Sequence, residues 1–97
     1  MRIISRKTLK EFWTGHPDAE SPLCAWFAEA TKANWESPAD VKALYAAASI
    51  LRDGRAVFNI GGNKYRLIVW INYTYQIIYI RWVGSHADYD KIDAQTI

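Results

Sequence analysis

The stretch VFNIGGNKYRLIVW, from Val57 to Trp70, decides the fold of this chain. Two apolar runs flank a Gly-Gly-Asn-Lys break, a pattern typical of two antiparallel strands joined by a tight hairpin, because Gly and Asn accept the positive φ that such turns need. The second run carries Arg66 where the middle of a strand is expected. A full charge at that position in so small a chain requires a reason.

Further strands are predicted on both sides of this hairpin. A third long strand is expected over YQIIYIRWV, residues 75–83, after a turn at NYT. The segment RII, residues 2–4, is expected to form a short edge strand, and Ser85 to cap a short closing helix or turn. The three long strands then form an antiparallel meander.

Three helical segments precede the strands. SRKTLKEFW has Ser5 as a candidate cap and ends before the GHP tripeptide. The second helix is expected to begin with Ser21 as its N-cap and Pro22 at its first position, and the third repeats the device with Ser37 and Pro38. The side chains expected to face the core are Leu9, Phe12, Trp13, Leu23, Trp26, Phe27, Ala30, Val41, Leu44 and Tyr45.

This order of elements predicts an α+β fold, with the N-terminal helices packed on one face of a small antiparallel sheet. The other face of such a sheet is left to water, which accommodates an arginine in mid-strand. Period-two alternation then assigns two faces, although a one-residue bulge would invert part of them. The predicted inward side chains are Phe58, Ile60, Leu67, Val69, Ile78 and Ile80. The predicted outward side chains are Asn59, Lys64, Arg66, Tyr79 and Arg81.

Length and composition narrow the class of protein. A chain of 97 residues fits one domain, residues 1–97, and a formal charge of +2 is small for a general nucleic-acid-binding module. The single cysteine, Cys24, excludes an internal disulfide, and its apolar neighbours indicate a buried packing thiol. No signal peptide or run of about 18 apolar residues is present, so we expect a cytoplasmic protein with no membrane partner.

The familiar catalytic motifs are missing. The two histidines lie far apart, no metal-ligand spacing occurs, and NIGGNK matches no phosphate-binding loop. We therefore expect no metal and no cofactor. What remains is a cluster of polar residues on the strands and just after them: Asn59, Lys64, Arg66, Arg81, His86 and Tyr89.

Such a cluster contains the groups needed to cleave RNA without a metal. The ribose 2′-OH attacks its own phosphate, which requires a proton acceptor, cations for the charge that develops on phosphorus, and a proton donor for the leaving 5′ oxygen. His86 is able to act as acid or base near neutral pH, Arg66 to hold phosphate oxygens, and Tyr89 to stack a base or orient an oxygen.

Each of these residues also has an ordinary structural interpretation. An isolated arginine in a strand is often a surface ion-pair partner, and a histidine near a chain end is often a cap or a solvated ring. Tyr89 is equally suited to pack its ring beneath a terminal segment. Lys64 beside a turn is commonly solvated, and Asn59 is able to shape the hairpin through side-chain hydrogen bonds. Composition and pattern alone lead no further than an α+β domain with one basic face.

The stretches VFNIGGNKYRLIVWINY and YIRWVGSHADYDKID resemble the HigB family of bacterial toxins, within the RelE/ParE-like superfamily. The family pattern places F-N-(I/V)-G-G-N in one strand and an arginine in the next, followed later by (Y/I)-(I/V)-(R/K) and T-H-x-(D/E)-Y-D. Here these patterns fall on 58–63, Arg66, 79–81 and 85–90. Ser85 replaces the usual Thr and keeps the hydroxyl.

The resemblance implies the toxin of a type II toxin–antitoxin system. Such toxins are metal-independent endoribonucleases that cut translated mRNA, usually within the ribosome, and a helix-turn-helix HigA-type antitoxin neutralises them. DNA is then contacted only indirectly, through the antitoxin. We assign catalysis to Arg66, His86 and Tyr89 and RNA binding to Asn59, Lys64 and Arg81. A ParE-like toxin that inhibits a protein such as DNA gyrase without cutting RNA is the alternative, and a general nucleic-acid-binding module is a third, weaker interpretation.

Overall fold

The structure is a computed structural model that describes residues 1–97. In chain order its elements are β1 Arg2–Ile4, α1 Arg6–Gly15, α2 Glu20–Lys32, α3 Pro38–Leu44, β2 Ser49–Ile50, β3 Arg55–Ile60, β4 Tyr65–Asn72, β5 Ile77–Ser85 and α4 His86–Tyr89. Short 3₁₀ turns at Pro17–Ala19 and Arg52–Gly54 precede α2 and β3. None of the helices combines the length and the hydropathy that crossing a bilayer requires.

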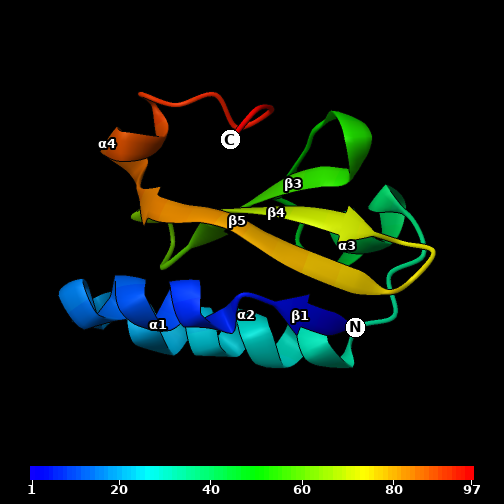
Figure 1. Ribbon diagram of the computed structural model, residues 1–97, viewed down its shortest axis with the longest axis horizontal. Helices are drawn as coiled ribbons and strands as arrows, with labels where there is room; N and C mark the ends of the chain where they lie inside the picture. The colour runs from blue at the N-terminus through cyan, green and yellow to red at the C-terminus, as the bar shows by residue number, and fades with distance from the viewer.

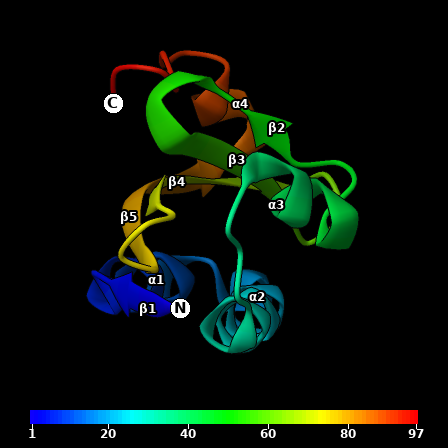
Figure 2. The same ribbon diagram turned by 90° about the vertical axis from the view of Figure 1, so that its right-hand side faces the viewer.

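One five-stranded sheet organises the molecule. Its strand order is β1-β5-β4-β3-β2, and all neighbours are antiparallel except β1 and β5. Helices α1 and α2 lie under one face of this sheet, and α4 with the C-terminal segment lies over the other (Figures 1 and 2). The predicted α+β class is confirmed.

The main core fills the space between the helices and the sheet. All six strand residues predicted to point inward belong to it. Phe58 lies at its centre, with the rings of Trp26, Trp35 and Tyr45 packed around it at centroid distances of 5.1–6.1 Å. Period-two alternation therefore identified the helix-facing side of the sheet correctly.

The opposite face of the sheet is only partly left to water: Asn59, Lys64 and Arg81 are exposed as predicted, but the rest of the face is covered. The chain after Ser85 turns back over it, and Val57, Ile68 and Ala94 form a second, smaller buried cluster there. Apolar side chains in or next to that returning segment, such as Tyr89 and Ile92, pack against the cluster, and burying them favours this path. Arg66, predicted to face solvent, is consequently only 8% exposed.

A β-bulge in β5 changes which side chains reach this second face. Ile68 in β4 pairs with Trp82, but the next residue, Val69, pairs with Ile80, so that Arg81 is the extra residue. Trp82 therefore joins the second face, although simple alternation groups it with Ile80. Its ring lies over Gly84, where an added Cβ would come within 2.3 Å of the indole.

Only one of the two proline-containing helices begins at the predicted residue. Helix α2 begins at Glu20, directly after the 3₁₀ turn, so that Ser21 and Pro22 lie within its first turn and are not its cap and first residue. Proline is tolerated there because its missing N–H would have no partner in the helix. Helix α3 begins at Pro38 as predicted, but the Ser37 side chain makes no capping bond.

Ser5 and the hairpin turn also differ in detail from the prediction. Ser5 occupies the N-cap position of α1 with a φ of 74° and makes no side-chain capping bond. In the β3–β4 hairpin the two glycines, Gly61 and Gly62, adopt positive φ as predicted, whereas Asn63 does not. Asn63 instead accepts hydrogen bonds from Arg66.

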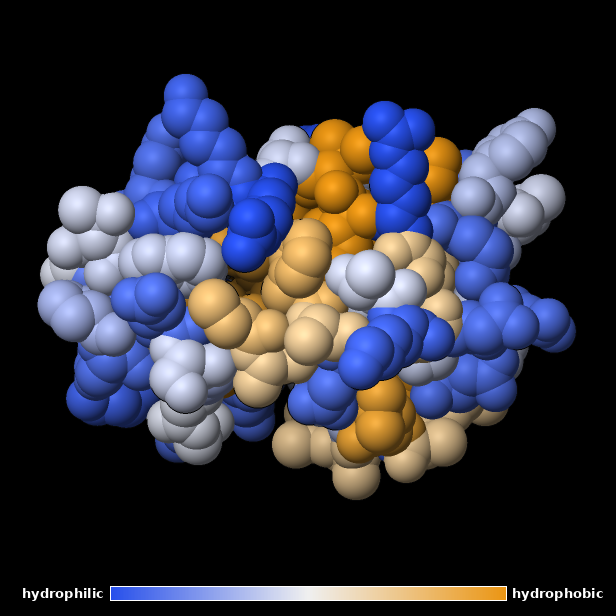
Figure 3. Space-filling model, turned by 90° about the horizontal axis from the view of Figure 1, so that it is seen from below, coloured by the Kyte–Doolittle hydropathy of each residue, from blue (hydrophilic) through white to orange (hydrophobic).

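Two side chains predicted to be buried are exposed. Cys24 lies on the outer side of α2, because Leu23, Trp26 and Ala30 define the stripe that faces the sheet. Leu44 is 51% exposed, because the short helix α3 buries only Val41. The helical side of the molecule displays apolar surface bordered by hydrophilic side chains (Figure 3).

Candidate active site

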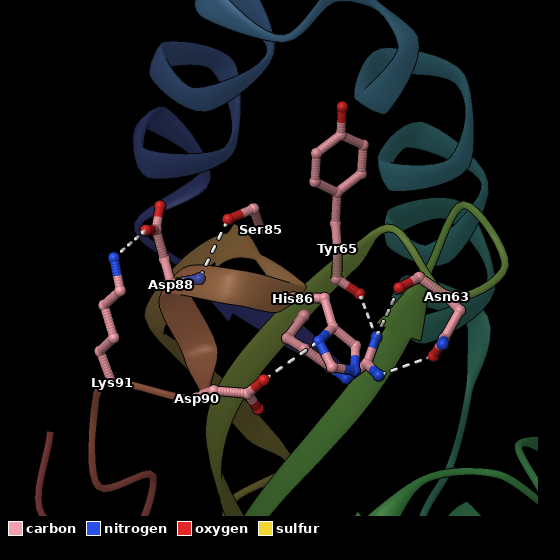
Figure 4. A network of polar contacts seen from close by, with 8 residues as sticks. Asn63, Tyr65, Ser85, His86, Asp88, Asp90 and Lys91 are labelled. Atoms are coloured by element: carbon pink, nitrogen blue, oxygen red, sulfur yellow. Dashed lines mark hydrogen bonds and ion pairs between the residues drawn. The ribbon is translucent and has the colours of Figure 1, made fainter.

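The Arg66 cluster, formed by Asn63, Arg66, His86, Tyr89 and Asp90, joins the β3–β4 hairpin to α4. Figure 4 shows Asn63 of the hairpin near His86 and Asp90 at α4. Within the sheet, Arg66 in β4 stands opposite Asn59 in β3 and Gly84 in β5. Helix α4 follows β5 directly and is tied to the hairpin, because the backbone N–H of His86 donates to the Lys64 carbonyl at 2.9 Å. The register of the strands and this hydrogen bond together bring the hairpin motif, residues 58–66, beside the C-terminal motif, residues 79–90.

Arg66 is the single buried charged residue of the chain. Its Nη1 donates to the carbonyls of Tyr65 and Asn63 at 3.1 and 3.2 Å, and its Nη2 donates to the side-chain oxygen of Asn63 at 2.7 Å. The guanidinium carbon lies 5.9 Å from the centre of the Tyr89 ring. None of the four ion pairs of the protein includes Arg66.

A cation in this environment favours the approach of an anion. Neutral carbonyl and amide oxygens orient the guanidinium but leave its charge uncompensated, and partial burial weakens the screening of that charge by water. The planar fork of donors matches two oxygens of one phosphate. Arg66 thus has the features expected of a group that stabilises negative charge, not those of a surface ion-pair partner.

His86 begins α4 and pairs with an acidic residue one turn further along. Ser85 caps this helix as predicted, its Oγ accepting a hydrogen bond from the Asp88 backbone N–H at 3.1 Å. The Nδ1 atom of His86 lies 3.4 Å from a carboxylate oxygen of Asp90. When Nδ1 carries the proton that faces Asp90, the other ring nitrogen, Nε2, is free to accept one. The imidazole remains accessible, with 45% of its side chain exposed.

Tyr89 lies half-buried between the other groups of the site. Its ring faces the Arg66 guanidinium and is tilted against Trp82, with 6.3 Å between the ring centres. The Trp82 ring in turn requires Gly84 beneath it. The three predicted catalytic residues, Arg66, His86 and Tyr89, are thus gathered at one end of the sheet.

The predicted RNA-binding residues are more dispersed. Asn59 is exposed directly opposite Arg66. Lys64 lies in the hairpin loop, and its ammonium group pairs with Asp18, which also accepts a hydrogen bond from the Tyr65 hydroxyl. Arg81, at the bulge, lines a separate pocket further along the sheet.

The Asp18 cluster has its own electrostatics. Hydrogen bonds from Lys64 and then Tyr65 lower the pKa of the Asp18 carboxyl below its ordinary value. The same bonds to Asp18 raise the pKa of the Lys64 ammonium group and that of the Tyr65 hydroxyl. These groups link the connection between α1 and α2 to the hairpin that carries Asn63.

Sequence reasoning missed Asn63 and Asp90. The first was read only as a turn residue, yet it holds Arg66 by both its carbonyl and its side chain. The second follows His86 by four residues, a spacing that places two side chains on one face of a helix and was available as a signal. No group of three His, Cys, Asp or Glu side chains is arranged to hold a metal ion.

Comparison with known proteins defines the class. Residues 19–92 match the family model described as the RelE-like toxic component of a toxin–antitoxin system. That segment covers more than half of the chain and includes every residue of the Arg66 cluster.

The relatives narrow the class further. The chain is 30% identical over 96 residues to the mRNA interferase toxin HigB of Escherichia coli strain K12, covering 97% of this chain and 92% of the relative. The mRNA interferase HigB of Shigella flexneri matches with the same identity and coverage. The mRNA interferase HigB of Escherichia coli O6:H1 is 23% identical over 94 residues, with 95% and 91% covered. This chain belongs to the HigB toxin family, as its motifs indicated.

Proposed function

We propose that this protein is the toxin of a type II toxin–antitoxin system and acts as a metal-independent, ribosome-associated mRNA endonuclease in the cytoplasm. The observation that carries the proposal is the partly buried, unpaired Arg66 guanidinium beside His86 and Tyr89. Membership of the HigB family and relatives that are named mRNA interferases support it. The cognate inhibitor is a HigA-type helix-turn-helix antitoxin.

The reaction is an internal displacement at a phosphodiester. Neutral His86 takes the proton of the ribose 2′-OH through Nε2, while Asp90 faces Nδ1 and stabilises the imidazolium that forms. The 2′ oxygen forms a bond to phosphorus, the bond to the 5′ oxygen breaks, and water protonates that leaving oxygen. The products are a 2′,3′-cyclic phosphate and a 5′-hydroxyl end.

Arg66 and Tyr89 act on the phosphate and the neighbouring base. Arg66 donates to the non-bridging oxygens, where charge accumulates in the transition state. Tyr89 faces the guanidinium and offers its ring to a base next to the scissile bond. Asn63 positions Arg66 through the 2.7 Å bond to Nη2.

The experiment is a reconstituted translation reaction in which new mRNA 5′ ends are mapped by primer extension. Wild-type protein is expected to create new ends within coding sequence that is being translated, and Arg66→Ala and His86→Ala to abolish them. Arg2→Ala serves as a matched control, because this exposed arginine lies in β1, away from the cluster. Arrested growth with intact mRNA and altered DNA supercoiling would instead identify a gyrase inhibitor.

A further inference from the structure

A polar pocket lies on the same face of the sheet as Arg66. It has a volume of about 290 Å³ and is lined by Asp53, Arg55, Trp70, Arg81 and Gln95. Trp70 is four residues from Arg66 along β4, which corresponds to roughly 13 Å. The pocket is therefore separate from the site of cleavage but within reach of the same RNA strand.

The pocket has two arginines that are held by main-chain oxygens of the C-terminal segment. Nη1 of Arg55 donates to the main-chain oxygens of Ala94 and Ile97 at 3.2 and 2.5 Å, and Nε of Arg81 donates to Ile97 at 3.4 Å. Neither guanidinium forms an ion pair with an acidic side chain. The C-terminal segment therefore orients both guanidinium groups through the main-chain oxygen of Ile97, and their other N–H donors suit a phosphate.

Trp70 provides a rigid aromatic surface in the same pocket. Its ring stacks on Tyr79, with 5.0 Å between centres and 30° between planes, and its Nε1 donates to the Asp53 carbonyl at 2.6 Å. The indole nevertheless remains 36% exposed. An indole held at its face and its edge, but still accessible, is suited to stack against a nucleobase.

Asp53 makes the pocket unlike a simple anion site. A carboxylate beside two arginines opposes a free phosphate, but it accepts hydrogen bonds from the amino group of a base. The combination of a carboxylate, an indole and two guanidinium groups therefore matches a whole nucleotide better than an inorganic anion.

We infer that this pocket binds one nucleotide of single-stranded RNA, with its base against Trp70 and its phosphate on Arg55 and Arg81. The inference deepens the proposed function, because it identifies where RNA next to the scissile bond is held. The same chemistry is offered by a nucleotide of mRNA and by an unpaired nucleotide of ribosomal RNA, and binding measurements separate the two sources.

The first measurement is binding to a fully 2′-O-methylated single-stranded oligoribonucleotide, which lacks the attacking hydroxyl and cannot be cut. Trp70→Leu is expected to weaken binding about 5- to 150-fold, as for loss of one stacked base. Arg81→Gln is expected to weaken it about tenfold and to lower the salt-dependence slope by about 0.7, the share of one phosphate contact. Arg2→Gln, which removes an exposed arginine in β1, should bind as wild type does.

The second measurement is binding of the same variants to purified ribosomes without mRNA. Loss of affinity only for the oligonucleotide identifies mRNA as the source of the nucleotide, and loss only for ribosomes identifies ribosomal RNA. Variants that melt like wild type and bind both partners normally would overturn the inference. Because neither measurement requires cleavage, a protein that binds RNA through this pocket but leaves mRNA intact would refute the proposed function alone. Normal binding by variants of a protein that cleaves mRNA would refute the pocket alone.

Discussion

At the scale of single residues, the decisive feature is that Arg66 is buried without a carboxylate. Replacing a solvent-facing arginine would change the free energy of unfolding very little. Arg66 instead donates hydrogen bonds to Asn63 and Tyr65 on the face of the sheet that the chain after Ser85 covers. Its contribution to folding is then a balance between hydrogen bonds to a charged group and the cost of removing that charge from water. Substitutions at Arg66 must be judged by fold and by activity together.

Arg66→Ala is expected to lower the free energy of unfolding by about 1 kcal/mol, because three hydrogen bonds are lost together with a poorly solvated charge. mRNA cleavage should fall about 100- to 1000-fold, as for loss of one donor to a developing charge. Arg66→Lys should restore part of the activity, because an ammonium group lacks the planar fork. Melting curves and cleavage rates test this, and normal cleavage by a folded Arg66→Ala protein would show that the chemistry lies elsewhere.

Asp90→Asn tests the partner of the proposed base. The substitution keeps the size of the side chain but removes the charge 3.4 Å from Nδ1 of His86. Cleavage should fall about tenfold, a fraction of the 100- to 10,000-fold that general acid–base catalysis supplies. Stability should change by no more than about 0.5 kcal/mol, since both side chains are largely exposed. Asp88→Asn, in the same helix, is the control, and an equal loss there would contradict a specific role for Asp90.

At the scale of elements, the end of β5 positions α4 and with it His86 and Tyr89. The bulge at Arg81 turns Trp82 onto the second face, and Gly84 leaves room for that ring beside Arg66. The segment therefore needs the absence of a side chain at one exact register position. Glycine is needed at position 84 because the Trp82 ring occupies the space of a Cβ, whereas Gly61 and Gly62 are needed because the hairpin turn has positive φ there.

Gly84→Ala is accordingly expected to displace the Trp82 ring and to destabilise the protein by about 1–3 kcal/mol, as overpacking does. Tyr89 rests against Trp82, so cleavage should fall as well. Gly15→Ala is the matched control, because nothing lies within 4 Å of a Cβ there and its φ is not positive. Chemical denaturation measures the free energy of unfolding of both variants, and equal values for the two would contradict the packing argument.

At the scale of the whole molecule, the helical layer and the β3–β4 hairpin are connected through Asp18. The carboxylate comes from the connection between α1 and α2 and meets Lys64 and Tyr65 on the hairpin. Because Asn63 of that hairpin holds Arg66, this contact joins the site to the layer on the far side of the sheet.

The Asp18 contact should give the stability a defined pH dependence. The pKa of Asp18 is lowered on folding, so its stabilisation is complete above the ordinary value of 3.8 and is lost as the pH falls through the lower folded value. The pKa of Lys64 is raised, so its share is complete below 10.5 and is lost as the pH rises through the higher folded value. Asp18→Asn should therefore be less stable than wild type near pH 7, with the difference shrinking below pH 3.8. Denaturation midpoints across this range measure it, and a pH-independent difference would contradict it.

The sequence by itself determined the order of the helices and of every strand except the two-residue β2, the hairpin at Gly61 and Gly62, and the six strand side chains that face the helices. Those features follow from local propensity and from a period of two, which neighbouring residues alone specify. The burial of Arg66, the outward positions of Cys24 and Leu44, and the pocket around Trp70 were decided only by the tertiary structure. The burial of Arg66 and the pocket around Trp70 depend on the path of residues 86–97 over the sheet and on the bulge at Arg81, because contacts between segments far apart in the chain set burial and leave no local periodic signal. Cys24 and Leu44 face outward because Leu23, Trp26 and Ala30 form the buried stripe of α2 and the short α3 buries only Val41.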